Sequence, residues 1–220
     1  MVPALRRFGH VPVAVDLPIR DPTAGLAEFT DVVCAALADQ DSAQHDGLMI
    51  VGQSLGGIVA PLVCERLRAQ LLVLLNAMVP MPGESAGDWW TATGHEQARA
   101  QYGDFDVMRD FFHDVPSDIV AAAFAEPPPG GPSERLFADP WPLGHWPSVT
   151  TRVLQGTDDR FFPLEFQRRV VRERLGLGLD EMPGGHLLAL SQAGELARRL
   201  DAYWAEIAVH QAQGSLQSSS

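Results

Sequence analysis

Short apolar runs alternate along the chain with segments in which apolar residues recur every three or four positions. Runs of this length are typical of β-strands, and the recurring spacing is typical of helices that bury one face. The expected strands cover residues 11–16, 48–52, 71–76, 152–155 and 179–182. The expected helices cover residues 26–37, 55–67, 164–175 and 191–209. Strands that alternate with helices predict an α/β fold with a mostly parallel sheet flanked by helices.

The alternation stops between residues 77 and 148, where Pro, Gly, Trp and Phe are frequent. Only short helical pieces are expected there, over residues 106–112 and over 118–125 with Ser117 as the capping residue. We interpret this stretch as a helical cap inserted into the core. The predicted organisation is a first core part at 1–76, the cap insertion at 77–148, a second core part at 149–210 and a disordered tail at 211–220.

Charge and hydropathy exclude several classes of partner. The formal net charge is −12, and all cationic side chains other than histidine are arginines. An acidic surface repels phosphate backbones and anionic membranes, so neither nucleic acid nor a membrane is expected as a partner. The longest apolar run, residues 71–81, is far shorter than the ~20 residues that span a bilayer. The first residues also lack the apolar region of a signal peptide, so a cytoplasmic location is expected.

No cofactor or metal is expected from the residues present. Cys34 and Cys64 each lie in an apolar, helix-like stretch and are expected to be buried. Six histidines are expected at the surface or in loops, and no two of them have the spacing of metal ligands: His10, His45, His95, His113, His145 and His210.

The sequence Gly52-Gln53-Ser54-Leu55-Gly56 lies between an expected strand and an expected helix. In so sharp a turn the serine backbone is strained and its hydroxyl is exposed, while Gly52 and Gly56 remove Cβ atoms that would collide. The turn also directs the Leu55 backbone N–H toward the oxygen of a carbonyl group that Ser54 attacks, as an oxyanion donor. We therefore interpret Ser54 as a nucleophile rather than as a solvent-exposed serine at a glycine-rich helix start.

A serine hydroxyl needs a general base, and the base needs an acid that orients it. Two later loops supply candidates. Asp158 and Asp159 follow one expected strand, and His186 follows the last one. The carboxyl ends of parallel strands share one edge of a sheet, so these side chains should gather near Ser54.

With a nucleophile, an acid and a base in the order Ser, Asp, His, the chain resembles the α/β-hydrolase family. The resemblance is strongest to small esterases and lyases with a helical cap, and it covers roughly residues 2–209. It implies that Ser54 is the nucleophile, that His186 is the base and that the Leu55 N–H is an oxyanion donor.

The resemblance also implies which aspartate is the acid. The acid of the family lies in a G-x-x-D-x-x-x-P loop, which runs here from Gly156 to Pro163 and places Asp159 in that role. Asp158 is the competing candidate and is expected to be an exposed loop carboxylate.

The resemblance fails near the N-terminus. The family has a third strand and a His-Gly turn ahead of its first helix, and the loop there donates a second oxyanion N–H. Residues 1–8 of this chain already resemble that helix, and residues 11–16 resemble the fourth strand. The fold is therefore expected to be N-terminally truncated relative to the family. Unpaired strand edges would favour self-association, and the missing donor would weaken catalysis.

Aromatic residues of the cap give the expectation for the substrate. Trp89, Trp90, Phe111 and Phe112 would roof an apolar pocket above Ser54, or else they form the small core of the cap itself. We expect a cofactor-free serine hydrolase that cleaves a small apolar or aryl carboxylic ester through an acyl-enzyme. Two alternatives stay open, since fold does not fix reaction: a lyase that uses the same triad as a base, and a non-catalytic ligand-binding homologue with an incomplete oxyanion hole.

Overall fold

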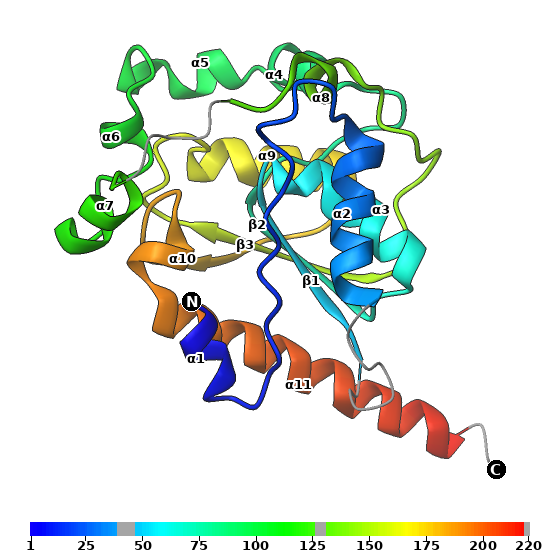
Figure 1. Ribbon diagram of the computed structural model, residues 1–220. Helices are drawn as coiled ribbons and strands as arrows, with labels where there is room; N and C mark the ends of the chain where they lie inside the picture. Colours follow the sequence, from blue (N-terminus) through cyan, green and yellow to red (C-terminus); the bar gives the residue numbers. More distant parts are fainter. Residues whose placement is uncertain (39–46, 126–130, 218–220) are drawn as a thin grey trace.

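A parallel sheet of four strands forms the centre of the molecule. The computed structural model describes residues 1–38, 47–125 and 131–217, and for 210–217 it describes the backbone alone. The strands are β1 (Met49–Ser54), β2 (Leu71–Ala77), β3 (Thr150–Gly156) and β4 (Asp180–Met182). They lie side by side in the order in which they occur along the chain (Figure 1). Each neighbouring pair is parallel, which confirms the predicted class of sheet.

Three helices lie where the apolar spacing predicts them. These are α2 (Leu26–Ala38), α3 (Gly56–Leu67) and α9 (Leu164–Leu175). A short helix α1 (Val2–Arg6) precedes them, and α10 (Leu188–Ser191) and α11 (Ala193–Gln217) follow the last strand.

The C-terminal region differs from its prediction. The helix expected from residue 191 begins at Ala193, after the separate turn α10. The tail predicted from residue 211 is helical as far as Gln217, and residues 218–220 lie outside the described part of the chain. None of the described helices combines the length and the apolar character needed to cross a membrane.

Helices cover both faces of the sheet. Leu72 and Leu74 of β2 pack in one apolar cluster with residues of α2, α3 and α9. Leu71, Val73 and Leu75 alternate with them and pack in a second cluster with residues of α10 and α11. Helix α1 lies against α11 on this second face (Figure 1). Because β2 is buried on both faces, its sequence is a nearly continuous apolar run.

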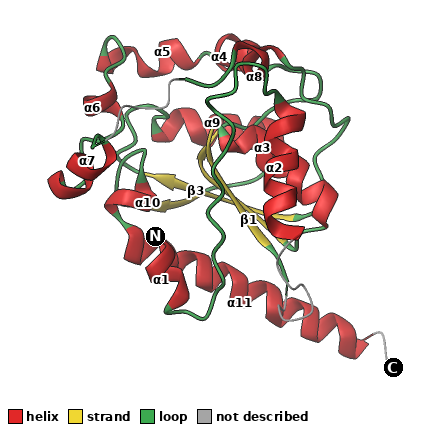
Figure 2. Cartoon of the chain, viewed as in Figure 1, coloured by secondary structure: helices red, strands yellow, loops and turns green. Residues whose placement is uncertain are grey.

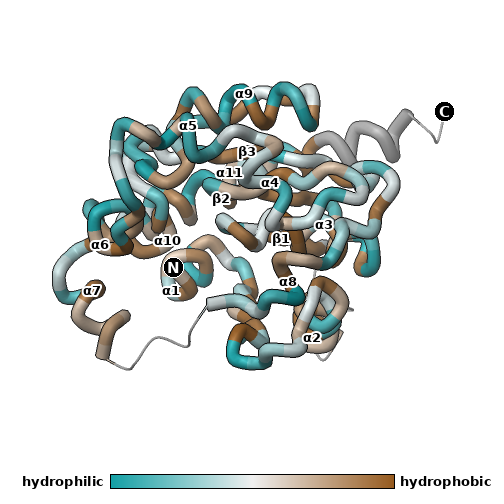
Figure 3. Tube along the Cα trace, turned by 90° about the horizontal axis from the view of Figure 1, so that it is seen from above, coloured by the Kyte–Doolittle hydropathy of each residue, from teal (hydrophilic) through white to brown (hydrophobic). Residues whose placement is uncertain are grey.

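The outer helices bury one side only. In Figure 3, α9 alternates between hydrophilic and hydrophobic residues along its length. Its buried residues include Phe166, Val170 and Val171, whereas Arg168 and Arg169 form ion pairs at the surface. This is the pattern that the recurring apolar positions predict.

Residues 11–16 form no strand, so the prediction of a fifth strand is wrong. The segment runs as an extended chain past the sheet (Figure 1), and none of the described strands pairs with it. Val11 and Val13 are 59% and 36% exposed and do not belong to the core. Their alternation has the period of a strand, but a strand also needs a partner for its backbone N–H and C=O groups.

Strand β1 lies at an edge of the sheet. Within the described residues it pairs only with β2, so its other side carries backbone groups without a strand partner. Val51, in the middle of β1, is 41% exposed. The self-association predicted for such an edge stays a prediction.

The described residues between β2 and β3 form short helices joined by loops (Figure 2). They are α4 (Ala86–Thr93), α5 (His95–Arg99), η2 (Ala100–Tyr102), α6 (Val107–Asp110), α7 (Ser117–Ala123) and α8 (Glu134–Ala138). Ser117 is the first residue of α7 rather than its cap, because Pro116 occupies the capping position. The Trp89 indole N–H donates to the Val79 carbonyl oxygen over 3.0 Å and holds α4 against the start of this segment, just beyond the end of β2.

Candidate active site

Ser54 lies in the predicted turn between strand and helix, at the end of β1 and just before α3. Its φ angle is 52°, in the left-handed region that residues other than glycine adopt only with strain. The backbone oxygen of Ser54 accepts a hydrogen bond from Met78 N (3.0 Å), which holds the turn against the end of β2. The residue is partly exposed.

The two glycines of the turn differ in their packing. A Cβ atom at Gly52 would lie 2.7 Å from the Cβ of Ala60 and 2.8 Å from the backbone oxygen of Gly56. Glycine at position 52 therefore allows α3 to approach β1. A Cβ atom at Gly56 would meet no atom within 4 Å, so the collision predicted there is wrong.

The structure brings Ser54, His186 and Asp159 into one hydrogen-bonded row. Ser54 Oγ lies 2.9 Å from His186 Nε2, and His186 Nδ1 lies 2.9 Å from Asp159 Oδ2. His186 and Asp159 are both buried. A neutral imidazole that donates from Nδ1 to a carboxylate leaves Nε2 as the acceptor for a hydrogen bond from the Ser54 hydroxyl.

The loop after β3 fixes the Asp159 carboxylate. Oδ1 accepts hydrogen bonds from the backbone N–H groups of Phe161 (2.8 Å) and Phe162 (2.9 Å). Oδ2 accepts one from Gln155 Nε2 (3.2 Å) in addition to that from His186. Donors on both oxygens hold the carboxylate in one orientation.

Asp158 is exposed, and its carboxylate bonds the backbone of the loop that carries His186 rather than the imidazole. Its Oδ2 accepts a hydrogen bond from Gly184 N over 3.1 Å. Of the two candidate acids, Asp159 is therefore the one whose carboxylate lies against His186.

Leu55 follows the candidate nucleophile with helical backbone angles (φ −56°, ψ −26°) and forms the N-terminal boundary of α3. The first N–H groups of a helix have no partner within the helix. Leu55 directly follows Ser54 at this helix start, and its role as an oxyanion donor stays a prediction.

The aromatic residues predicted to line a pocket do not form one wall. Trp89 is fully buried in the packing between cap and core, so its assignment to a pocket wall is wrong. Phe111 stacks on the His186 ring, with the ring centroids 4.6 Å apart. Phe112 packs against Phe124 instead, with a centroid separation of 5.1 Å.

Trp90 lies at a separate hollow of about 260 Å³. The other residues that line this hollow are Thr91, His95, Glu96 and Gln97. None of the three residues of the hydrogen-bonded row takes part in it.

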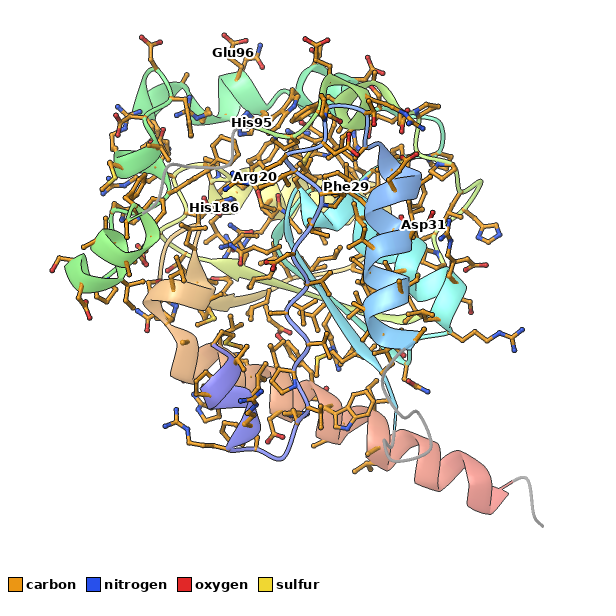
Figure 4. The ribbon with its side chains drawn as sticks, in the orientation of Figure 1. Arg20, Phe29, Asp31, His95, Glu96 and His186 are labelled. Carbon is orange, nitrogen blue, oxygen red and sulfur yellow. The ribbon has the colours of Figure 1, made fainter. Side chains whose placement is uncertain are left out.

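His95 is buried, so the prediction of a surface or loop position is wrong for this residue. In Figure 4, Glu96 lies at the outer surface of α5, and His95 lies inward of it, on the side of His186. Its Nε2 lies 2.7 Å from the Phe161 carbonyl oxygen. Burial lowers the pKa of the His95 imidazole, Arg99 lowers it further, and the hydrogen bond to Phe161 opposes both effects. His45 and the side chain of His210 lie outside the described part of the structure.

Three side chains that were not predicted contact the loop of His186. Asp114 accepts a hydrogen bond from Gly185 N (2.7 Å), and Gln53 Nε2 donates to the His186 carbonyl oxygen (3.1 Å). Asn76 binds the same loop from the end of β2. A polar residue at the end of an apolar strand is a visible signal for Asn76, whereas Asp114 has none because its cap segment is remote in sequence.

The described residues offer no metal site. Among residues 1–38, 47–125 and 131–217, no three His, Cys, Asp or Glu side chains gather closely enough to hold an ion. Cys64 is buried, which raises the pKa of its thiol to about 12, and Cys34 is partly buried.

Solved structures share this architecture at low sequence identity. Polyneuridine aldehyde esterase is 18% identical with a TM-score of 0.72, and the match covers 90% of this chain and 90% of that chain. A pyrethroid hydrolase from Sphingobium faniae JZ-2 is 21% identical with a TM-score of 0.65, covering 96% of this chain and 91% of that chain. An extracellular alpha/beta-hydrolase from a Paenibacillus species is 20% identical with a TM-score of 0.62, covering 90% and 88%.

Sequence identities this low show a shared fold alone, whereas a match to a family model shows the family. A search of curated proteins found no match. The model of the alpha/beta hydrolase family matches residues 1–199, which include the strand-to-helix turn and both later loops. The chain therefore belongs to the alpha/beta hydrolase family.

Proposed function

We propose that this chain is a cofactor-free serine hydrolase that cleaves small apolar or aryl carboxylic esters through an acyl-enzyme. The observation that carries the proposal is the row of Ser54, His186 and Asp159, with 2.9 Å at each of its two links. Such a row activates a serine hydroxyl, because the imidazole accepts the proton as the oxygen attacks.

The first half of the reaction forms the acyl-enzyme. Ser54 Oγ attacks the ester carbonyl carbon, and its proton moves to His186 Nε2. The Leu55 N–H stabilises the oxyanion, and Asp159 stays ionised and stabilises the imidazolium. The bond to the alcohol oxygen then breaks, and that oxygen takes the proton from Nε2.

The second half releases the acid. A water molecule gives one proton to His186 Nε2 as its oxygen attacks the acyl carbon. The bond to Ser54 Oγ breaks, the serine regains its proton from Nε2, and the carboxylic acid leaves. Both halves use the same base and the same oxyanion donor.

Aromatic rings beside the base support an apolar substrate. Phe111 stacks on the His186 imidazole, and Phe161 lies edge-on to it with centroids 5.2 Å apart. Phe105 packs against both phenylalanines and is 50% exposed. An aryl or medium alkyl group would bury apolar surface against these rings. Structural neighbours named as an esterase and as a pyrethroid hydrolase support ester hydrolysis in general.

A fluorophosphonate probe and p-nitrophenyl butyrate test the proposal together. The parent chain should be labelled at Ser54 and should hydrolyse the ester, whereas Ser54→Ala should lose labelling and about 10⁴-fold or more of kcat. Ser117→Ala, which changes an exposed serine of the cap, is the matched control. It should keep the labelling at Ser54 and the ester turnover of the parent.

The other outcomes identify the competing functions. Labelling at Ser54 without turnover of any ester would favour a lyase that uses the same base. An unlabelled Ser54 in a folded chain would favour a ligand-binding homologue. Ester turnover that survives in Ser54→Ala would overturn the assignment of the nucleophile.

A further inference from the structure

Asn76 occupies an irregular position in the central strand. Gln53 of β1 pairs with Leu75 of β2, and the next residue, Ser54, pairs with Ala77, so Asn76 is an extra residue in the ladder. Its φ angle is 44°, and it is completely buried. Such a bulge redirects the side chain of the extra residue, and asparagine tolerates the left-handed conformation better than most residues do.

The redirected side chain joins the two loops that carry the acid and the base. Asn76 Oδ1 accepts a hydrogen bond from Gly156 N (2.7 Å), at the start of the loop of Asp159. Asn76 Nδ2 donates to the carbonyl oxygens of Gly185 (3.0 Å) and His186 (2.9 Å). One amide group therefore fixes the backbone of both loops.

The two loops also touch each other beside this amide. A Cβ atom at Gly156 would lie 2.4 Å from the carbonyl oxygen of Gly184 and 2.7 Å from that of Gly185. Carbonyl oxygens packed so closely against a neighbouring backbone need donors: the Gly184 oxygen accepts from Asp158 N (3.0 Å), and the Gly185 oxygen accepts from Asn76 Nδ2.

Asparagine meets three demands of this position that aspartate and alanine do not meet together. The bulge requires a residue that accepts a positive φ, Gly156 N requires an acceptor, and the two carbonyl oxygens require donors. An aspartate keeps the acceptor but lacks the donors, and an alanine lacks both.

We infer that Asn76 is a positioning residue, which holds His186 at the distance from Ser54 and Asp159 that proton transfer requires. It does not touch the substrate in this role; it acts through the backbone of His186. The kinetic part of this inference rests on the proposed function, whereas the placement of the imidazole is a property of the folded chain alone.

The test compares Asn76→Ala and Asn76→Asp with a buried amide whose side-chain hydrogen bond goes to neither loop. Gln167 of α9 is equally buried and donates to the carbonyl oxygen of Ala77, next to Asn76. Gln167→Leu therefore removes a buried hydrogen bond at the same strand end without reaching His186. Unfolding by urea measures how much stability each variant loses.

Two readouts separate positioning from stability. The first is kcat and KM for p-nitrophenyl butyrate, calculated per folded molecule. The second is the low-field proton resonance of the His186 Nδ1–H, observed by NMR and assigned with His186→Ala. This resonance reports the hydrogen bond to Asp159 even if the chain hydrolyses no ester.

We expect Asn76→Ala to lower kcat about 10- to 100-fold with KM nearly unchanged, as small misplacements of reacting groups do. Its His186 resonance should shift or disappear. Asn76→Asp keeps the bond to Gly156 N, and we expect the same direction of change; it replaces Asn76→Ala if that variant does not fold. Gln167→Leu should keep the parent kcat and resonance.

An unchanged resonance in both Asn76 variants would overturn the inference, as would an equal effect in Gln167→Leu. Failure of the proposed function has a different signature, because ester turnover would then survive in Ser54→Ala or be absent from the parent. The resonance would still decide the role of Asn76.

Discussion

The Phe111 ring lies nearly parallel to the His186 imidazole, with the ring centroids 4.6 Å apart and the planes inclined by 18°. Phe111 belongs to the cap, at the end of α6, whereas His186 belongs to the core. One face of the candidate base is therefore covered by an inserted element. Stacked aromatic pairs contribute about 0.5–1.5 kcal/mol beyond the area that they bury.

Removal of the Phe111 ring should affect substrates with an aryl acyl group more than small ones. For Phe111→Ala we expect kcat/KM for p-nitrophenyl benzoate to fall about tenfold, the equivalent of ~1.4 kcal/mol, because the acyl ring loses its apolar neighbour. The value for p-nitrophenyl acetate should change less. Phe112→Ala, whose ring packs against Phe124, is the control. Equal losses for both esters would exclude Phe111 as part of the substrate surface.

The two neighbouring aspartates should respond very differently to the same substitution. Asp159→Asn should lower kcat by about 10⁴-fold, since an amide beside Nδ1 favours the wrong imidazole tautomer. Asp158→Asn should be nearly silent, because that carboxylate is exposed and bonds only its own and the adjacent loop. Steady-state kinetics with p-nitrophenyl butyrate measure both variants. The reverse ranking would assign the acid to Asp158.

Protonation of His95 should make the fold less stable in acid. Burial lowers the pKa of His95 in the folded chain, so the unfolded chain binds the proton more readily. The contribution of His95 is therefore complete above the unfolded pKa of about 6.5 and is lost as the pH falls from there toward the lower folded value.

Unfolding by urea at a series of pH values measures this dependence. His95→Gln can still donate to the Phe161 carbonyl oxygen but carries no charge, so its free energy of unfolding should fall less steeply below about pH 6.5. His145→Gln, at an exposed position, should keep the parent slope. Parallel curves for His95→Gln and the parent would show that the buried imidazole does not cause the loss of stability in acid.

The free edge of β1 should promote self-association. On the side where no strand of the described residues pairs with it, its backbone groups offer a template for another strand, and the exposed Val51 adds apolar surface. We expect the hydrodynamic size of the parent to increase with concentration. The hydrodynamic size of Val51→Lys should stay small, because a lysine on an edge strand opposes pairing with another strand. Val209→Lys, at an exposed position of α11, is the control. A parent chain that stays monomeric at all concentrations would contradict this expectation.

Local patterns predicted the parts of this molecule that depend on nearby residues. The turn at Ser54 and the loops of Asp159 and His186 follow strands whose ends are marked by the sequence itself. Residues 11–16 have an equally clear pattern, but whether they form a strand depends on a partner that their own sequence does not specify. His95 was missed for a similar reason, because its burial depends on rings such as Phe161 that lie far along the chain.

The site can form during refolding only after distant parts of the chain have come together. Ser54 and His186 are 132 positions apart, and strands β2 and β3 must take their places before the two side chains meet. Helices form from local contacts within microseconds, whereas parallel strands wait for the closure of long loops. Recovery of probe labelling at Ser54 should therefore trail the recovery of helical circular dichroism, and a reactive Ser54 marks a chain in which the whole sheet has been assembled.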